Sequence, residues 1–590
     1  MKQFLLTMAG VFAGLVLFFI GVPFLILAMV AGAARPAPPS GPSVLTLDLR
    51  RGLTDQDSTS PFAALSGKSL SVMSVTAALR RAESDNAVKG LFVRLPEGGM
   101  PPAAADELRL AFKRFEATGK PVVAHSQGLY PSGVITSTYM LGAAANQLWM
   151  QPGAPFQAVG LASDDIFFKR FFDKYGVKAQ YEQRYEYKNA VNSYLYDDYT
   201  PAHRQSELSW MGSVYGSALA QAAADRKESP AALRATLESG PYDAGDALAK
   251  GLIDRVGQVK EAQTAILGQA GDGAKLVEMD DYVAAAKAAG GGIGRPTVAV
   301  VNAEGVIMTG PSDTGFGGSQ NVNSDDVSSA LYQAAEDTAV KAIVFRVSSP
   351  GGSDTASEQI LAAVRAAKAK KPVVVSMGTY GASGGYWISS AASAIVAEPT
   401  TLTGSIGVYG GKFALGEALS RFGVDMRQLS VGGGYAGAEG PAQPFTPTQR
   451  VAFSAAIDRV YEGFITRVAS GRRLSPARVR EIARGRVWTG VQAKQLGLVD
   501  QLGGFYQAVE RAKGLAGLAG QEVRLKVVVV HKSPFEALQR AFGLDSSSLR
   551  ALGAAASVLS DPRMASLTDE IGHAEARSRG ALVLAPTPFH

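Results

Sequence analysis

Ser383 lies between an alanine and two glycines, shortly after the apolar stretch 372–376. A serine at a glycine-rich turn between a strand and a helix suits a nucleophile, because the turn exposes Oγ and nearby N–H groups can receive an oxyanion. A second glycine-rich turn at 348–353 follows the apolar stretch 341–347. Ligands bind at the carboxyl ends of parallel strands, so the two turns indicate one site. The alternative is that these glycines only make tight turns.

The residue composition excludes several kinds of chemistry that could otherwise accompany Ser383. The 590-residue chain has no cysteine, which excludes disulfides, thiolate metal sites and a cysteine nucleophile. None of the five histidines lies beside the two turns, and none is spaced for a helical zinc motif, so we expect no metal and no cofactor. His125 is predicted to be a buried core histidine. The net charge of +6 is spread over the chain, which argues against nucleic-acid binding.

Short β-branched runs alternate with amphipathic helical stretches around the two turns. This alternation predicts an α/β fold with a mostly parallel sheet. In the second half of the chain we expect strands near 297–303, 341–347, 372–376 and 394–398, and helices near 354–369 and 446–472.

The two halves of the chain resemble each other. Segments 88–94, 120–123 and 247–254 match 340–346, 371–374 and 493–500, at nearly constant separation. A diverged duplication produces this pattern. We therefore predict a first repeat over 43–290, a second repeat over 296–520 and a C-terminal extension over 521–590, to which we assign no role.

The amino-terminal end is apolar. Residues 3–34 carry no charge and are long enough, as a helix, to cross a hydrocarbon core of ~30 Å. A cleavable signal peptide needs an apolar region of only ~7–15 residues, so a transmembrane anchor over 1–35 is the first interpretation. A signal peptide cleaved near Ala31-Gly32-Ala33 is the alternative. The proline-rich segment 36–42 is predicted to be a stiff spacer.

Several motifs together resemble one known family, the signal peptide peptidase A or protease IV family, in its long two-repeat bacterial form. The motifs are Ser349-Pro350-Gly351-Gly352-Ser353, Ala382-Ser383-Gly384-Gly385-Tyr386-Trp387, Leu402-Thr403-Gly404-Ser405-Ile406-Gly407 and Gly485-Arg486-Val487-Trp488-Thr489-Gly490. The resemblance extends from the anchor to about residue 515. It implies two tandem repeats of the ββα-stacked, protease/crotonase-like fold, preceded by one transmembrane helix.

The resemblance also implies a lysine base in place of histidine. The family's lysine motif is similar to Tyr187-Lys188-Asn189, in the first repeat. Lys188 aligns with Tyr435 of the second repeat, and Ser383 with the region of Thr136 in the first, so each half holds what the other lacks. A lysine base must be neutral, which requires burial without a carboxylate. Glu186 is therefore expected to point elsewhere.

The remaining roles are also implied by the resemblance. Ser383 and Lys188 are expected to be catalytic, Gly352 and Gly384 to supply the oxyanion hole, and Ser405 to orient the lysine amine. The implied substrates are peptides, the signal-peptide remnants left in the membrane. We further expect a homo-oligomer, perhaps a tetramer, held by one pass in the bacterial inner membrane with its catalytic part on the periplasmic side.

Two other functions stay open at this stage. A crotonase-like acyl-CoA enzyme would use the glycine-rich oxyanion hole without a nucleophile and would need acidic residues nearby. A non-catalytic membrane scaffold would result if serine and lysine never meet.

Overall fold

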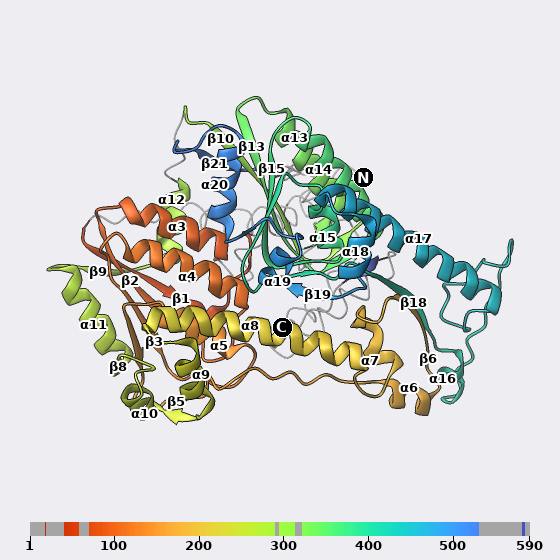
Figure 1. Cartoon of the computed structure of the whole chain (residues 1–590), viewed down its shortest axis with the longest axis horizontal. Coiled ribbons are helices and arrows are strands. Elements are labelled where there is room, and N and C mark those ends of the chain that lie inside the picture. Colours follow the sequence, from red (N-terminus) through yellow and green to blue (C-terminus); the bar gives the residue numbers. More distant parts are fainter. Residues whose placement is uncertain are drawn as a thin grey trace, which may run out of the picture.

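The protein is a mixed α/β molecule with one parallel sheet and one mostly parallel sheet (Figure 1). The computed structural model describes residues 41–57, 70–288, 294–312, 321–529 and 581–584, together with positions 14 and 18. The predicted anchor at 3–34 and the spacer at 36–42 lie almost wholly outside these ranges. Within the described ranges, no helix combines the length and apolarity needed to cross a membrane.

The first sheet is built from residues 43–278, and every neighbouring pair of its strands is parallel. Its strand order is β8-β4-β3-β2-β1-β9. The strands are β1 (Ser43–Asp48), β2 (Val88–Arg94), β3 (Val122–Ser126), β4 (Gln147–Met150), β8 (Arg255–Val256) and β9 (Lys275–Glu278). The residues of β3 are all buried, as expected of a parallel strand covered on both faces.

The second sheet repeats this connectivity. Its strands β20-β16-β15-β13-β10-β21 stand in the same order as β8-β4-β3-β2-β1-β9, with β17 and β19 added beside β15. The strands are β10 (Thr297–Glu304), β13 (Val340–Ser349), β15 (Val373–Ala382), β16 (Ala394–Ala397), β17 (Leu402–Gly404), β19 (Val487–Thr489), β20 (Gln501–Leu502) and β21 (Arg524–Val527). The four strands predicted for this half are confirmed. The shared order is what a duplication produces.

The helices also correspond between the halves. The first half has α3 (Val72–Ser84), α4 (Pro102–Glu116), α5 (Ile135–Ala143), α6 (Lys169–Tyr175), α7 (Asn192–Leu195), α8 (Pro201–Arg226), α9 (Pro230–Glu238), α10 (Ala244–Ala249), α11 (Val259–Ala270) and α12 (Met279–Ala288). The second has α13 (Ser324–Glu336), α14 (Asp354–Lys368), α15 (Gly384–Ser389), α16 (Gly416–Ser420), α17 (Pro447–Arg472), α18 (Pro476–Ile482), α19 (Gly490–Gln495) and α20 (Phe505–Leu515). The two helices predicted near 354–369 and 446–472 are confirmed.

The long helices α8 and α17 show the correspondence most clearly. Each begins with a threonine N-cap followed by proline, and each ends at a basic residue with positive φ, Lys227 or Arg473. A threonine cap satisfies a free N–H at the start of a helix, and proline fits there because its missing N–H is not needed. The same start and stop signals therefore specify both helices.

Each half has its own hydrophobic core, and the contacts that join the halves include a strand pair and a buried ion cluster. Strand β6 (Lys178–Arg184) of the first half pairs antiparallel with β18 (Val408–Ala414) of the second. At the other junction, Arg346 lies buried between Asp55 and Glu107 of the first half, with Nε 2.9 Å from Asp55 Oδ2 and Nη2 2.8 Å from Glu107 Oε2. We call these three residues the inter-repeat ion cluster.

The remaining short elements complete the chain. They are β5 (Pro155–Phe156), β7 (Tyr242–Asp243), β11 (Ile307–Met308), β12 (Val322–Asn323), β14 (Gly351–Ser353), β22 (Ala581–Leu584) and two 3-10 turns, Leu49–Arg51 and Asn189–Val191. Strands β12, β11, β14 and β22 form a separate small sheet in that order.

Candidate active site

Ser383 occupies the sharp turn between β15 and α15. Its φ of 54° and ψ of −118° lie in a region that non-glycine residues seldom adopt. The turn is held by the Ser383 N–H, which donates to the Gly404 carbonyl at 2.9 Å. The side chain is fully buried. A strained, fixed turn of this kind presents Oγ in one direction, as the sequence predicted for a nucleophile.

Gly384 and Gly352 lie against each other beside this serine. A Cβ on Gly384 would stand 3.1 Å from the Gly352 nitrogen and 2.8 Å from Ser357 Oγ. A Cβ on Gly352 would stand 2.1 Å from the Ile307 carbonyl oxygen of β11. Gly352 has no room for a side chain and one at Gly384 would crowd its neighbours, so the two glycine backbones can lie close together beside Ser383. The structure thus brings together the two residues that were predicted to form an oxyanion hole.

Lys188 reaches this serine from the first half of the chain. It follows β6, immediately before the turn Asn189–Val191, and is fully buried. Its Nζ lies 2.8 Å from Ser383 Oγ, 3.0 Å from the Ser405 carbonyl oxygen and 3.0 Å from Ser405 Oγ. A neutral amine has two N–H donors and one lone pair, so the two Ser405 oxygens can take the donors while the lone pair accepts the Ser383 hydroxyl proton.

The charge state of Lys188 follows from its surroundings. Burial holds the pKa of the Lys188 amine well below its usual value, because the ammonium form loses its hydration. Glu186 does not oppose this effect. Its carboxylate pairs with Arg484 at 2.6 Å and is partly exposed, so it points away from Lys188 as the sequence analysis required.

Ser405 lies in a second strained turn, after β17. Its φ is 47°, and its N–H donates to the Arg486 carbonyl at 2.8 Å. Its Oγ also lies 3.4 Å from the Gly485 carbonyl oxygen. The structure therefore places Ser405 against the lysine amine, where the sequence predicted it.

Gly485 is a site residue that sequence reasoning missed. It has a φ of +81°, and a Cβ there would stand 2.5 Å from both the nitrogen and the Cβ of Lys188. Its backbone forms the wall against which Lys188 packs. The signal was present in the motif that begins at Gly485, but no spacing rule connects that motif to a lysine almost 300 residues earlier.

Two other residues named from the sequence lie apart from this constellation. His125 is buried in β3, with Nε2 3.0 Å from the Gly257 carbonyl oxygen, and burial lowers its pKa. Thr136, the first-half counterpart of Ser383, is buried in α5. His125 is therefore the core histidine that was predicted.

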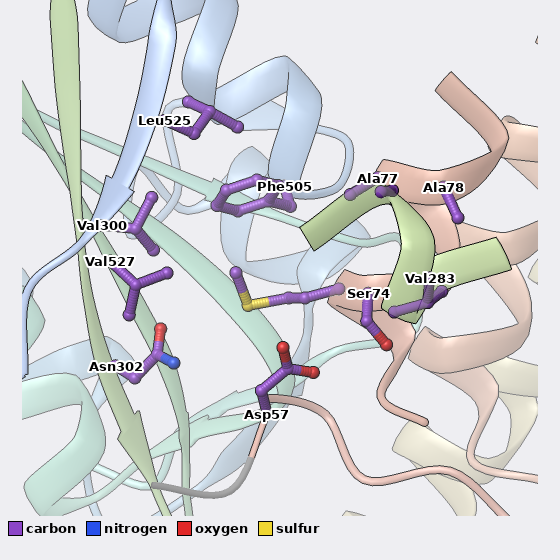
Figure 2. Close-up of a pocket in the computed structure, with 12 residues that line it drawn as sticks. Asp57, Ser74, Ala77, Ala78, Val283, Val300, Asn302, Phe505, Leu525 and Val527 are labelled. Atoms are coloured by element: carbon purple, nitrogen blue, oxygen red, sulfur yellow. The ribbon is translucent and has the colours of Figure 1, made fainter. Parts of the chain in front are cut away.

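A separate cavity of about 300 Å³ lies between the two halves (Figure 2). Its wall is mainly apolar, with Asp57 and Asn302 at one end. Val283 and Phe505 contribute from opposite halves. None of the five predicted site residues lines it, so this cavity is not the site predicted from the sequence.

The fold and this geometry define a class. A buried serine in a strained strand-to-helix turn, next to two glycines and to an amine that contacts no carboxylate among the described residues, has the parts of a serine hydrolase.

The chain belongs to peptidase family S49, whose model matches residues 114–271 and 365–519, one segment in each half. It is 34% identical over 500 residues to protease 4 of Salmonella typhi, covering 80% of this chain and 78% of that protein. It is 31% identical over 541 residues to protease 4 of Haemophilus influenzae, covering 86% and 84%. The chloroplastic serine protease SPPA of Arabidopsis thaliana is 28% identical over 489 residues, covering 81% and 69%. The protein is a serine peptidase of the two-repeat signal peptide peptidase A form.

Proposed function

We propose that the chain hydrolyses peptide bonds with Ser383 as nucleophile and Lys188 as general base. The observation that carries this proposal is the 2.8 Å separation of Lys188 Nζ and Ser383 Oγ, inside a buried site where desolvation favours the neutral amine. An amine in that state can accept the serine proton, which an ammonium cannot.

The reaction proceeds in two displacements. Ser383 Oγ attacks the peptide carbonyl carbon while its proton passes to Lys188 Nζ, and the N–H groups of Gly352 and Gly384 hold the resulting oxyanion. The carbonyl re-forms as the C–N bond breaks, and the Lys188 ammonium gives its proton to the leaving amine. Water then loses a proton to Lys188, attacks the acyl-enzyme and releases the carboxylate, returning the hydroxyl proton to Ser383.

Ser405 has a positioning role in this scheme. Its carbonyl and hydroxyl oxygens accept the two amine N–H bonds, which leaves the lone pair directed at Ser383. Such an arrangement fixes the amine without supplying a negative charge that would favour its protonation.

The two other functions receive less support. A crotonase-like acyl-CoA enzyme would need acidic groups at the reacting centre, whereas the contacts of Lys188 Nζ among the described residues are with Ser383 and Ser405. A non-catalytic scaffold has no need of an amine and a hydroxyl held together by two strained turns.

The proposal also covers the substrates, the location and the oligomeric state of the enzyme. A relative from Enterococcus faecium, 33% identical over 198 residues, has the printed name putative signal peptide peptidase SppA, which supports cleaved signal peptides as substrates. We place the enzyme in the bacterial inner membrane, anchored by residues 3–34 with one pass and with its catalytic part on the periplasmic side. We further propose two crotonase-like ββα repeats over 43–290 and 296–520, and a homo-oligomeric state with the tetramer as its first candidate.

The test is cleavage of a fluorogenic peptide by Ser383→Ala and Lys188→Ala. We expect each to lose at least about 10³-fold in kcat, since each removes a group on which both displacements depend. Ser389→Ala is the matched control, because Ser389 is a buried serine in the helix that follows Ser383, and its hydroxyl donates to the Gly385 carbonyl. Full activity of either dyad variant, with an unchanged circular dichroism spectrum, would remove that residue from the mechanism.

A further inference from the structure

Glu207 lies on α8, next to the turn that carries the proposed general base. Its Oε1 accepts the Asn189 Nδ2–H at 2.9 Å, and Asn189 is the residue that follows Lys188. Its Oε2 accepts the indole N–H of Trp210 at 2.7 Å. Both donors are buried, with 4% of Asn189 and 3% of Trp210 exposed. One carboxylate therefore links the lysine turn to the long helix α8.

Helix α8 is in turn held against the second half of the chain. It contacts β19, and Trp210 packs in one apolar cluster with Leu402 and Val487 (Figure 1). Leu402 is the first residue of β17, which ends just before Ser405. Val487 is the first residue of β19, which begins shortly after Gly485. The strands that lead to the neighbours of the lysine amine thus pack on the second partner of Glu207.

The position of the amine depends on the turn behind it. Lys188 Nζ stands at the end of four methylene groups, so a shift of the backbone at Lys188 moves Nζ relative to Ser383 Oγ. Among the residues that the structure describes, Asn189 Oδ1 has no hydrogen-bond partner. The contact with Glu207 is therefore what fixes the Asn189 side chain, and with it the start of the turn Asn189–Val191.

The contact needs a hydrogen-bonding group at position 207 and not its charge. Burial raises the pKa of Glu207 to about 7, so the carboxylate and the neutral acid are both present near neutral pH. The carboxylate accepts both N–H donors. The neutral acid keeps both contacts if the Asn189 amide turns over, because Asn189 Oδ1 then accepts the carboxyl proton. Glutamine offers the same pattern, with one acceptor and one donor group.

We propose that Glu207 is a positioning residue that holds the Asn189 turn against α8 and thereby keeps Lys188 Nζ in reach of Ser383 Oγ. This inference rests on the dyad proposed above. Glu207 takes no part in proton transfer, and its contacts are with Asn189 and Trp210 rather than with the groups assigned to the peptide. Loss of the contact should therefore lower kcat and leave KM nearly unchanged.

The test measures kcat and KM on a fluorogenic peptide for Glu207→Ala, Asn189→Ala, the double variant and Glu207→Gln. Each single alanine variant should lower kcat by about 10- to 100-fold, since a displacement of about 1 Å can cost as much. Because Glu207 acts through Asn189, the double variant should be no slower than Glu207→Ala. Glu207→Gln should keep at least roughly half of the wild-type kcat, because the amide retains the hydrogen bond. Asn189→Ala carries the same expectation if Glu207→Ala folds poorly.

Asp254→Ala is the matched control. The Asp254 carboxylate also accepts donors from two partners in the first half, Arg226 Nη1 at 2.9 Å and the Leu148 N–H at 2.7 Å. This variant should lower the midpoint of thermal unfolding without changing kcat per folded molecule. Multiplied losses in the double variant, or a Glu207→Gln enzyme as slow as Glu207→Ala, would overturn the positioning role.

The rate at which a fluorophosphonate labels Ser383 separates this inference from the dyad. Slow labelling of both Lys188→Ala and Glu207→Ala supports the dyad and the positioning role together. Slow labelling of Lys188→Ala beside wild-type labelling of Glu207→Ala would reject the positioning role and retain the dyad. Wild-type labelling of Lys188→Ala would reject the dyad, and the positioning role with it.

Discussion

Lys188 depends on burial alone for its charge state. Desolvation by burial lowers its pKa, and no charged neighbour contributes among the residues that the structure describes. Burial disfavours the ammonium, so the neutral form predominates from a lower pH than for a lysine in water. The base is therefore active where an ordinary lysine, with a pKa of about 10.4, would be protonated.

This argument predicts the pH dependence of kcat/KM. As pH rises through the lowered pKa of Lys188, the amine loses its proton and the rate increases, reaching a plateau well below pH 10. A pH–rate profile measured on an uncharged peptide checks this expectation. Lys188→Arg is the control, because guanidinium stays protonated and should leave no ascending limb. A wild-type limb centred near pH 10 would contradict a desolvated base.

At the residue scale, the identity of the general base was the hardest part of the site to predict from the sequence. Ser383 could be found from its glycine-rich turn, but Lys188 has no local signal, and its partners stand 195 and 217 residues away along the chain. Only the resemblance to a family pointed to it. Gly485 was missed for the same physical reason, since its requirement for glycine arises from packing against Lys188.

At the scale of elements, two turns and one strand pair hold the site. Strand β6 ends shortly before Lys188 and β18 begins shortly after Ser405, so the β6–β18 pair positions both residues. The backbone of Gly485 packs against Lys188. A substitution at Gly485 should therefore move the Lys188 amine away from Ser383 without altering either reacting side chain.

Gly485→Ala is predicted to lower kcat by about 10²-fold or more, because its Cβ would overlap Lys188 and a displacement of about 1 Å can cost that much. Gly517→Ala is the matched control. Gly517 also has positive φ, +72°, but a Cβ there meets nothing within 4 Å, so only the conformational cost of roughly 1 kcal/mol applies. Kinetics and thermal unfolding of both variants check this. Equal kcat values in Gly485→Ala and Gly517→Ala would show that Lys188 keeps its position when the Gly485 backbone is altered.

The elements themselves were predictable where local pattern decides them. Strands β10, β13, β15 and β16 and helices α14 and α17 fall within a few residues of the ranges expected from apolar runs and amphipathic spacing. The β6–β18 pair was not foreseen, because its strands come from different halves and their pairing is decided by how the halves dock. The same applies to β22, whose partner lies over 200 residues earlier.

At the scale of the whole molecule, the site exists only while the two halves stay docked. The inter-repeat ion cluster lies at that junction, and Arg346 is 1% exposed. Two further buried acids, Glu304 and Glu398, interact with its charge. Burial raises the pKa of Glu304 to about 8 and holds that of Glu398 well above its usual value, and the charge of Arg346 opposes both shifts. Arg346 is therefore a cation that lowers the free-energy cost of burying several carboxyl groups at this junction.

Arg346→Ala is predicted to destabilise the protein by about 3–5 kcal/mol at pH 7.5, since it leaves Asp55 and Glu107 buried without a partner. Chemical unfolding measures the loss, and peptide cleavage should fall with it because the halves that supply Lys188 and Ser383 are no longer held in register. Arg226→Ala is the control, because Arg226 pairs with Asp254 at 2.9 Å within the first half. This control variant should lower the free energy of unfolding, with little change in activity per folded molecule. If Arg346→Ala kept full activity per folded molecule, docking of the halves would depend on the β6–β18 pair and not on this cluster.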